Sequence, residues 1–212
     1  MAFNVKERGR VTYYYGGDAP TLSALVTEKL DGGDGEDTLR GRSTSDVFVT
    51  TGPNAGTVNG LPFIEIETLD GHDGGDTYVV LLAGVQMIDV SILDTGSMAS
   101  DLDSVIVIGS AAADVFVIDE QQVMLGIHMV RYDTSLEQVH VFGHAGDDQF
   151  MVTQSAYVQF FIYGGGHGTA GDELVYVHNG LTTPIDNLTG EISDPPFQSV
   201  IYTTMEWVVF MP

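Results

Sequence analysis

Apolar and polar residues alternate in short runs along most of the chain, and clusters of glycine and aspartate separate these runs. The apolar positions are rich in Val, Ile, Phe and Tyr. A two-residue period bounded by turn-forming residues is typical of β-strands. The pattern predicts strands at Asp46–Thr51, Ile64–Leu69, Thr77–Leu82, Ile88–Leu93, Val105–Ile108, Asp114–Ile118, Val139–Phe142, Gln149–Val152, Tyr157–Tyr163 and Leu174–Val177. Thr21–Lys29 is the one weak helix candidate, and a capping strand fits it equally well.

A longer period overlies the strands. Ser43–Val49 is similar to Ala111–Val117, and the turn at Asp76 is similar to the turn at Asp148. Strand ends between Leu30 and Tyr163 are spaced as one or two units of about 20–24 residues, a period that is typical of stacked coils. We therefore expect an all-β fold, a right-handed parallel β-helix or β-roll solenoid with about 20–24 residues per coil.

The two ends of the chain differ from its middle. Residues 1–29 contain Tyr13–Tyr15 and most of the basic residues, which favours an N-terminal cap or a degenerate first coil. Residues 30–180 form the predicted repeat solenoid. Residues 181–212 contain Pro184, Pro195 and Pro196 in an irregular stretch and end on the apolar strand Glu206–Phe210, which favours a C-terminal strand or cap.

The repeat has a recognisable turn motif. Leu30–Leu39 contains Gly-Gly-x-Gly-x-Asp-x-Leu, and degraded copies occur at Leu69–Tyr78, Phe142–Phe150, Tyr163–Leu174 and, more weakly, Leu93–Val105. Over residues 30 to about 180 the chain resembles the RTX, or haemolysin-type, calcium-binding repeat family. The resemblance implies a parallel β-roll, Ca²⁺ held by glycine carbonyls and aspartate carboxylates, and secretion by a type I route.

The motif supplies the candidate metal ligands. Hard cations such as calcium take six to eight oxygen ligands. We expect these ligands from Gly32, Asp34, Asp37, Asp73, Asp76, Asp94, Asp103, Asp147, Asp148 and Asp172. The alternative is that these aspartates are ordinary turn residues.

Coil stacking would bring some of these acids together. The coil spacing pairs the turn Asp70–Asp76 with Asp94–Asp103, and the turn Gly143–Asp148 with Tyr163–Asp172. Equivalent positions of neighbouring coils lie about 4.8 Å apart. Two carboxylates at that distance repel by roughly 3–4 kcal/mol at an effective dielectric constant near 20, so a bound cation would couple metal binding to folding.

Three histidines, His72, His144 and His167, follow a glycine at comparable turn positions. A histidine column that binds zinc or nickel is one interpretation. The other is that histidine occupies positions of positive φ, which it tolerates better than most residues.

The amino-acid composition disfavours some classes of binding partner. Thirty acidic residues oppose seven basic ones, for a net charge of −23, which disfavours nucleic acid and anionic lipid. The chain has no cysteine, and no apolar run is long enough for a membrane span. An N-terminal signal peptide is not recognisable. The chain is therefore cytosolic, exported by a route that needs no N-terminal signal, or cut from a longer protein. The resemblance to the RTX family favours an extracellular or cell-surface location.

The favoured function is a non-catalytic, calcium-stabilised structural segment of a rod, adhesin, sheath or surface layer. Its expected partners are calcium ions, neighbouring copies or flanking repeats of the same protein, and extracellular polysaccharide. One alternative is a polysaccharide-active β-helix enzyme or its carbohydrate-targeting module, although residues 43–212 hold only Arg131 as a Lys or Arg residue. Glu65 and Glu67 lie on one face of a predicted strand, as a glycosidase pair or as a solvated strand face would. The other alternative is a solenoid that folds without metal.

Overall fold

The computed structural model describes residues 29–84, 86–96, 101–180, 184–186 and 190–212, together with the backbone of residues 2–7 and 10–15. These residues form strands, turns and loops and include no helix, and hence none that is long and apolar enough to cross a membrane. The helix candidate Thr21–Lys29 lies, except for its last residue, outside the described residues. The prediction of an all-β chain is confirmed for the described part.

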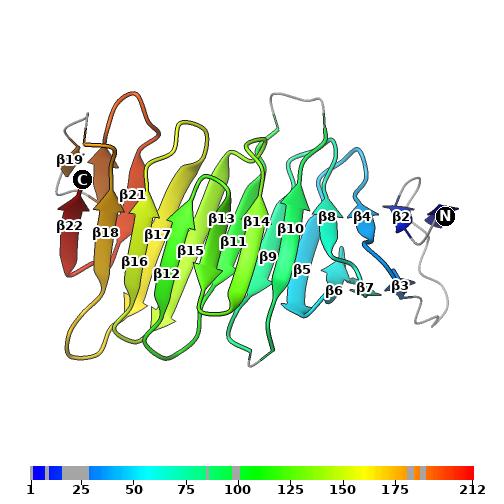
Figure 1. Cartoon of the computed structure of the whole chain (residues 1–212), viewed down its shortest axis with the longest axis horizontal. Helices are drawn as coiled ribbons and strands as arrows, with labels where there is room; N and C mark the ends of the chain where they lie inside the picture. The colour runs from blue at the N-terminus through cyan, green and yellow to red at the C-terminus, as the bar shows by residue number, and fades with distance from the viewer. Residues whose placement is uncertain are drawn as a thin grey trace.

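The strands form two sheets of eleven strands each (Figure 1). In spatial order, sheet A contains β1 (Ala2–Glu7), β2 (Arg10–Tyr15), β4 (Thr38–Arg40), β8 (Thr68–Asp70), β10 (Asp89–Leu93), β14 (His128–Tyr132), β13 (Gln122–Leu125), β12 (Val115–Asp119), β16 (Gln149–Thr153), β18 (Glu173–Val177) and β22 (Trp207–Met211). Sheet B contains β19 (Ile185–Asp186), β20 (Glu191–Ser193), β21 (Val200–Thr203), β17 (Gln159–Gly166), β15 (Gln138–Ala145), β11 (Ser104–Ile108), β9 (Thr77–Leu81), β5 (Val47–Gly52), β6 (Ala55–Val58), β7 (Leu61–Ile64) and β3 (Leu30–Asp31).

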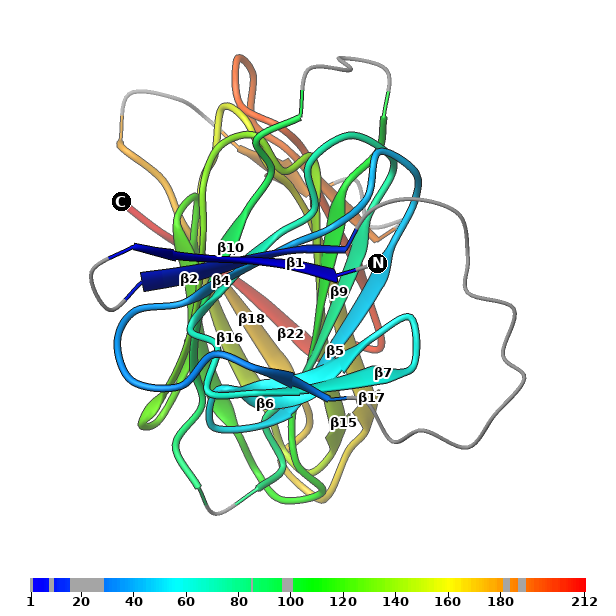
Figure 2. The same ribbon diagram turned by 90° about the vertical axis from the view of Figure 1, so that its right-hand side faces the viewer.

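The chain crosses repeatedly from one sheet to the other. From β7 to β12, for example, successive connections lead to sheet A, sheet B, sheet A, sheet B and sheet A, and the crossing strands pair in parallel with those of the preceding crossing. Viewed from the N-terminal end, the two sheets face each other across the core (Figure 2). The sheets are mixed but mostly parallel, as expected when each strand returns to its sheet through a crossover.

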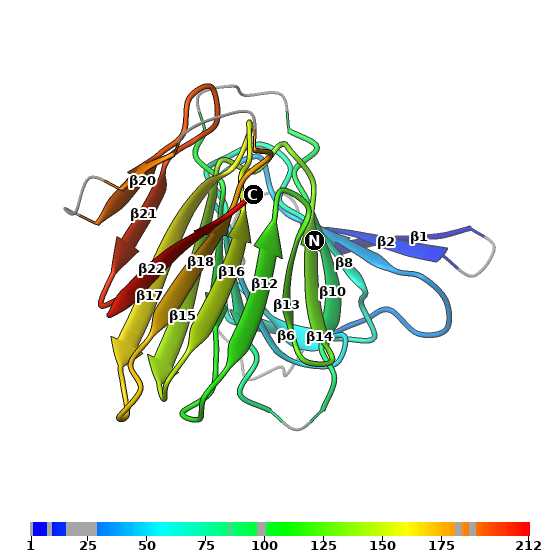
Figure 3. The same ribbon diagram turned by 60° about the vertical axis from the view of Figure 1, so that its left-hand side comes forward.

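Antiparallel hairpins interrupt the crossings. β5, β6 and β7 form one meander in sheet B, β12, β13 and β14 form another in sheet A, and β19, β20 and β21 form a third in sheet B (Figure 3). Asn59 and Gly60 join β6 to β7 with φ values of 49° and 80°, and two successive positive φ angles are typical of a type I′ hairpin turn. The sequence pattern did not predict these hairpins.

The hairpins make the repeat irregular. The parallel partners Gln138 and Gln159 are separated in sequence by about one predicted unit, because the chain crosses between them without a hairpin. Val47 and Thr77 are also parallel partners, but they lie farther apart in sequence because the β6–β7 hairpin is inserted between them. The uniform coil length expected from the sequence is therefore present only where no hairpin interrupts the crossing.

One predicted strand is divided. Ile64–Leu69 was expected to be continuous, but the chain bends between β7 and β8, where Glu65 has a φ of 54°. Glu65 is exposed in this bend, whereas Glu67 approaches the start of β4. The two carboxylates therefore do not share one strand face, and this correction removes the carboxylate pair expected for a glycosidase.

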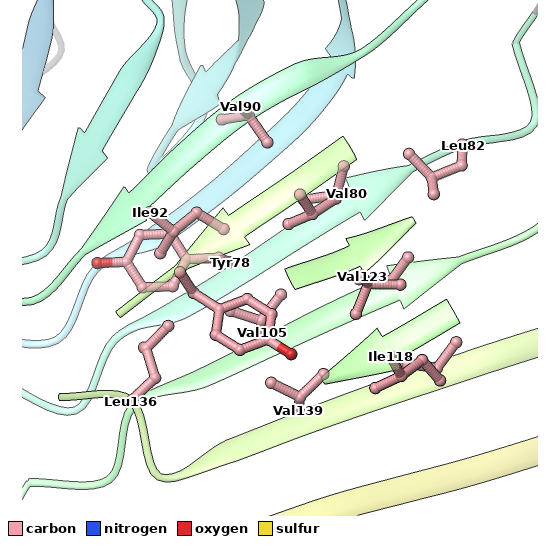
Figure 4. Packing of buried hydrophobic residues seen from close by; sticks show 14 of the residues in the cluster. Tyr78, Val80, Leu82, Val90, Ile92, Val105, Ile118, Val123, Leu136 and Val139 are labelled. Atoms are coloured by element: carbon pink, nitrogen blue, oxygen red, sulfur yellow. The ribbon is translucent and has the colours of Figure 1, made fainter. Parts of the chain in front are cut away.

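Alternate residues of the strands fill the space between the sheets. β9, β10, β11 and β16 each alternate between half-buried and buried positions along their length. Tyr78, Val80, Val105 and Val139 of sheet B meet the inward residues of sheet A in this core (Figure 4). Each buried aliphatic or aromatic side chain stabilises the fold by about 1.5–3 kcal/mol, so the sheets are held together mainly by this layer.

Aromatic rings stack along the core between successive parallel strands. The rings of Phe48 and Tyr78 lie 5.0 Å apart and nearly parallel, and so do those of Phe116 and Phe150. Each pair consists of residues that are directly opposed in register. The register of the sheets is therefore fixed by both the backbone and the core.

Candidate functional site

A common corner precedes many of the strands. A glycine directly follows the preceding strand or, in β15, lies near its end; four residues, which form an arch, separate this glycine from an aspartate that directly precedes the next strand. Five corners have this spacing: Gly32 with Asp37, Gly41 with Asp46, Gly71 with Asp76, Gly109 with Asp114, and Gly143 with Asp148. At each corner a Cβ on the glycine would lie within 2.9 Å of the aspartate Oδ2, so the carboxylate packs directly on the glycine backbone.

The aspartates of successive corners are linked by hydrogen bonds. At the start of sheet B strands, the amide of Asp46 donates to Oδ1 of Asp76 (2.6 Å), and the amide of Asp76 donates to Oδ1 of Asp103 (2.6 Å). The amide of Asp103 then donates to Oε2 of Glu137 (2.8 Å). We call Asp46, Asp76, Asp103 and Glu137 the first ladder.

A second ladder lies at the start of sheet A strands. The amide of Asp114 donates to Oδ1 of Asp148 (2.8 Å), and the amide of Asp148 donates to Oδ1 of Asp172 (2.8 Å). The amide of Asp172 donates to Oε2 of Glu206 (2.6 Å). We call Asp114, Asp148, Asp172 and Glu206 the second ladder.

Each step of a ladder is reinforced in the opposite direction. The amide of Thr77 donates to the carbonyl of Asp46, and the amide of Ser104 donates to the carbonyl of Asp76. At each step the amide of one residue thus donates to the side chain of the next corner, and the carbonyl of the same residue accepts from the strand that follows that corner. A single step of the same kind joins Asp37 to Glu67, whose Oε2 accepts the Asp37 amide at 2.9 Å.

The aspartates of both ladders are buried, whereas the two terminal glutamates, Glu137 and Glu206, are exposed. Asp76 is 0 % exposed, Asp103 2 % and Asp148 1 %. Burial raises the pKa of Asp76 from 3.8 to about 8, and the nearby charges of Asp46, Asp103 and Asp94 add to this effect. The hydrogen bond from the Asp46 amide lowers the pKa and offsets part of the rise. Burial and the neighbouring Asp94 raise the pKa of Asp103 to about 7, and burial and Asp172 raise that of Asp148 to about 6. Folding therefore shifts these three acids toward their protonated form, compared with the unfolded chain.

The second carboxylate oxygen distinguishes the corners. Oδ2 of Asp46 accepts the Arg42 amide (2.5 Å), and Oδ2 of Asp114 accepts the Ser110 amide (2.6 Å). Oδ2 of Asp76, Asp148 and Asp172 is buried and has no hydrogen-bond partner.

At two of these three corners, a histidine follows the glycine. His72 and His144 occupy the place of Arg42 and Ser110 and have φ values of 72° and 86°, and their amides do not donate to Oδ2 of Asp76 or Asp148. The interpretation that histidine occupies positions of positive φ is confirmed for these two. His144 pairs in register with Gly165, and His72 lies against Gly96, so the described histidines do not form a column.

The predicted ligands divide into two groups. Gly32, Asp37, Asp76, Asp103, Asp148 and Asp172 belong to the buried corners, whereas Asp34, Asp73, Asp94 and Asp147 lie on the arches, where Asp34 is exposed and the others are half-buried. Asp147 accepts the amides of Gly171 (2.8 Å) and Ala170 (3.2 Å), which lower its pKa. Asp94 accepts the Gly96 amide (3.1 Å) and contacts the carboxylate of Asp103.

The expected stacking of turns is confirmed. The amide of Gly74 donates to Asp101, and Asp76 is bonded to Asp103, so the turn Asp70–Asp76 lies beside Asp94–Asp103. Asp148 is bonded to Asp172 in the same way. In the part of the chain that the structure describes, no group of three or more His, Asp or Glu side chains is arranged to hold a metal ion, and calcium binding stays a prediction.

Sequence reasoning did not identify three glutamates as acceptors of an aspartate amide: Glu137 and Glu206, which end the two ladders, and Glu67, which accepts from Asp37. Each directly precedes a strand, as the ladder aspartates do, and this position is the signal that identifies them. Comparison of the chain with models of protein families, with curated proteins and with solved structures finds no match.

The raised pKa values predict an unusual pH dependence. Between pH 3.8 and about 8 the folded state binds more protons at Asp76 than the unfolded chain, so the stability falls as the pH rises through this window. Asp148 contributes in the same direction up to about pH 6. We expect the melting temperature, measured by circular dichroism, to be higher at pH 5.5 than at pH 8.5.

High salt separates this effect from the repulsion of the overall charge of −23. Exposed charges are screened in 1 M NaCl, whereas buried ones are screened much less. The pH dependence should persist in 1 M NaCl. A melting temperature that is constant or rises from pH 5.5 to 8.5 at this salt concentration would contradict the raised pKa values of Asp76, Asp103 and Asp148.

Proposed function

We propose that this chain is a structural, non-catalytic module, a right-handed parallel β-solenoid that acts as an acidic spacer in an extracellular or cell-surface protein. The observation that carries the proposal is the pair of ladders, which tie successive strands together from Asp46 to Glu137 and from Asp114 to Glu206. Their carboxylates are engaged with backbone amides rather than directed into a common cleft. Acidic residues that are engaged in this way favour a structural role over a catalytic one.

Calcium is part of the proposal. Asp94 and Asp103 are in contact, and their proximity raises the pKa of Asp103. A divalent cation at this pair, with backbone carbonyls and water completing its shell, would offset the charge beside the buried Asp76. The buried Oδ2 of Asp76 without a hydrogen-bond partner supports a demand for compensating charge at this corner.

We expect calcium to stabilise the protein at pH 8, where Asp103, with a pKa of about 7, is mostly ionised. If the free calcium concentration is about 100 times the dissociation constant, the stabilisation is about 2.7 kcal/mol. For a chain of this length it corresponds to a rise of about 5–10 °C in melting temperature. The measurement is thermal unfolding by circular dichroism in calcium and after exhaustive dialysis against EDTA.

Two controls make this test specific. Magnesium at the same ionic strength separates coordination from screening, and Asp94→Asn should remove most of the calcium effect. Glu120→Gln, in the turn between β12 and β13 and outside the predicted ligands, removes the same charge and should retain it. Identical melting curves in calcium and in EDTA would exclude the calcium part of the proposal, and the structural role would then rest on the ladders alone.

A further inference from the structure

The outward side of sheet B differs from the rest of this acidic chain. Here the name "sheet B face" denotes the outward residues of β5, β9, β11, β15, β17 and β21. Its central row is formed by residues directly opposed in register: Val49, Val79, Ile106, His140, Phe161 and Ile201. All of them are half-buried within a sheet that carries no third layer of described strands or helices.

The rows beside the central one are also uncharged. Leu81, Ile108, Phe142 and Tyr163 are opposed in register on one side of it. Thr77, Ser104, Gln138 and Gln159 are opposed on the other side. The sheet B face therefore has no Asp, Glu, Lys or Arg, although the chain carries a net charge of −23. Burial lowers the pKa of His140, so that this ring is also neutral at pH 7.

The outward side of sheet A has a different character. Asp89, Asp119, Arg131 and Glu173 occupy outward positions on its strands. Charged residues are thus tolerated at outward positions of this fold. Their exclusion from sheet B across six strands cannot be attributed to the strand structure itself.

The aromatic rings of the sheet B face lie against each other. The rings of Phe142 and Tyr163 are 4.3 Å apart, those of His140 and Phe161 are 4.3 Å apart, and both pairs are nearly parallel. Ring faces that stack on each other are not available to stack on a sugar. The rings present their edges instead, and together with the aliphatic residues they form a surface suited to packing against another sheet.

We propose that the sheet B face packs against the same face of a second copy of this chain. On a neutral face, two chains of charge −23 can approach without apposing like charges. A two-fold axis would match the apolar rows of one copy with those of the other. This inference does not depend on calcium or on the spacer role.

The size of the face predicts a weak dimer. Six strands at about 4.8 Å and five residues at about 3.3 Å cover roughly 30 by 16 Å, or about 1,000 Å² over two copies. This area is at the lower end for a specific interface. We therefore expect monomers at low micromolar concentration and dimers at hundreds of micromolar.

Sedimentation velocity of the whole chain between 5 and 500 µM tests the proposal. We expect a shift from monomer to dimer that is enhanced in 0.5 M NaCl, because salt screens the repulsion between the remaining charges. Ile106→Glu places a charge in the central row and should weaken the association at least ten-fold. Met151→Glu, at a half-buried outward position of sheet A, is the matched control and should retain the dimer.

A second measurement covers the possibility that Ile106→Glu does not fold. The chain has no cysteine, so a nitroxide can be attached to Ser104→Cys on the sheet B face and, separately, to Ser91→Cys on the outward side of sheet A. On concentration, the label at position 104 should lose access to a water-soluble relaxation agent, and the label at position 91 should keep it.

Three outcomes would overturn the proposal. The first is a monomer at all concentrations. The second is a dimer in which the label at position 104 stays accessible, as expected if copies associate through the exposed apolar edge strand β22. The third is that dextran retains the wild-type chain but not the Ile106→Glu variant, while neither forms a dimer. This result would assign the sheet B face to a sugar chain.

Discussion

Replacement of Gly32 by alanine is expected to reduce the free energy of unfolding by about 3 kcal/mol or more. A Cβ at this position would lie 1.8 Å from the backbone carbonyl oxygen of Glu65 and 2.9 Å from Oδ2 of Asp37. The first contact is with backbone, so no rotation of a side chain relieves it. The amide of Gly32 also donates to the carbonyl of Ile64 (3.0 Å), so β3 and the bend after β7 must separate to admit the methyl group.

Gly52→Ala is the matched control for this experiment. Nothing lies within 4 Å of a Cβ at Gly52, and its backbone is outside the left-handed region. Alanine there should leave the stability unchanged or raise it by about 0.4–1 kcal/mol through the unfolded state. Urea unfolding followed by far-ultraviolet circular dichroism gives both values. Equal stabilities of the two variants would mean that the close approach of β3 to residue 65 is absent in solution.

Replacement of Asp76 by alanine is expected to lower the free energy of unfolding by about 2 kcal/mol at pH 6. The mutation removes the acceptor of the Asp46 amide and leaves a buried donor unpaired in the middle of the first ladder. It also removes the side chain that packs on Gly71. Measurement at pH 6 is chosen because the carboxyl group, with a pKa of about 8, is then mostly protonated.

Asp76→Asn distinguishes the hydrogen bond from the charge. Asparagine keeps an acceptor for the Asp46 amide and cannot ionise, so at pH 6 its stability should stay close to that of the wild type. At pH 9 the wild type carries a buried charge that the variant lacks, and the variant should be the more stable of the two. If the alanine and asparagine variants are equally unstable at pH 6, the carboxylate acts through packing and not as the acceptor in the ladder.

Much of the fold was predictable because it depends on local alternation. The strands β9, β10, β11, β16 and β18 follow the period-two pattern of β-branched and aromatic residues, and the structure has them within one or two residues of the predicted bounds. The hairpins were not predictable from the same pattern. A strand that turns back within its sheet and one that crosses to the other sheet show the same alternation, and the difference lies in short turns such as Asn59-Gly60.

The candidate site was predictable in position and not in detail. The motif located the corners and, through the coil spacing, the pairing of Asp76 with Asp103 and of Asp148 with Asp172. It treated all the aspartates of a turn as equivalent. The last aspartate faces inward because a strand begins at the next residue, whereas Asp34 remains outside on the arch. The amide that donates to each carboxylate belongs to a residue far away in the sequence. A local sequence pattern does not specify this partner.

The hydrogen bonds of the ladders all run in one direction along the chain, and this gives the molecule a polarity. Each amide relies on a carboxylate that comes later in the sequence, and Glu137 and Glu206 close the two series. Loss of the last member leaves the member before it with an unsatisfied donor, whereas loss of the first member frees a carboxylate that water can solvate. Fraying at the carboxyl end therefore removes the acceptor of a ladder aspartate amide, whereas fraying at the amino end removes the backbone carbonyl that accepts from the first residue of the next strand, so the two ends lose different hydrogen bonds.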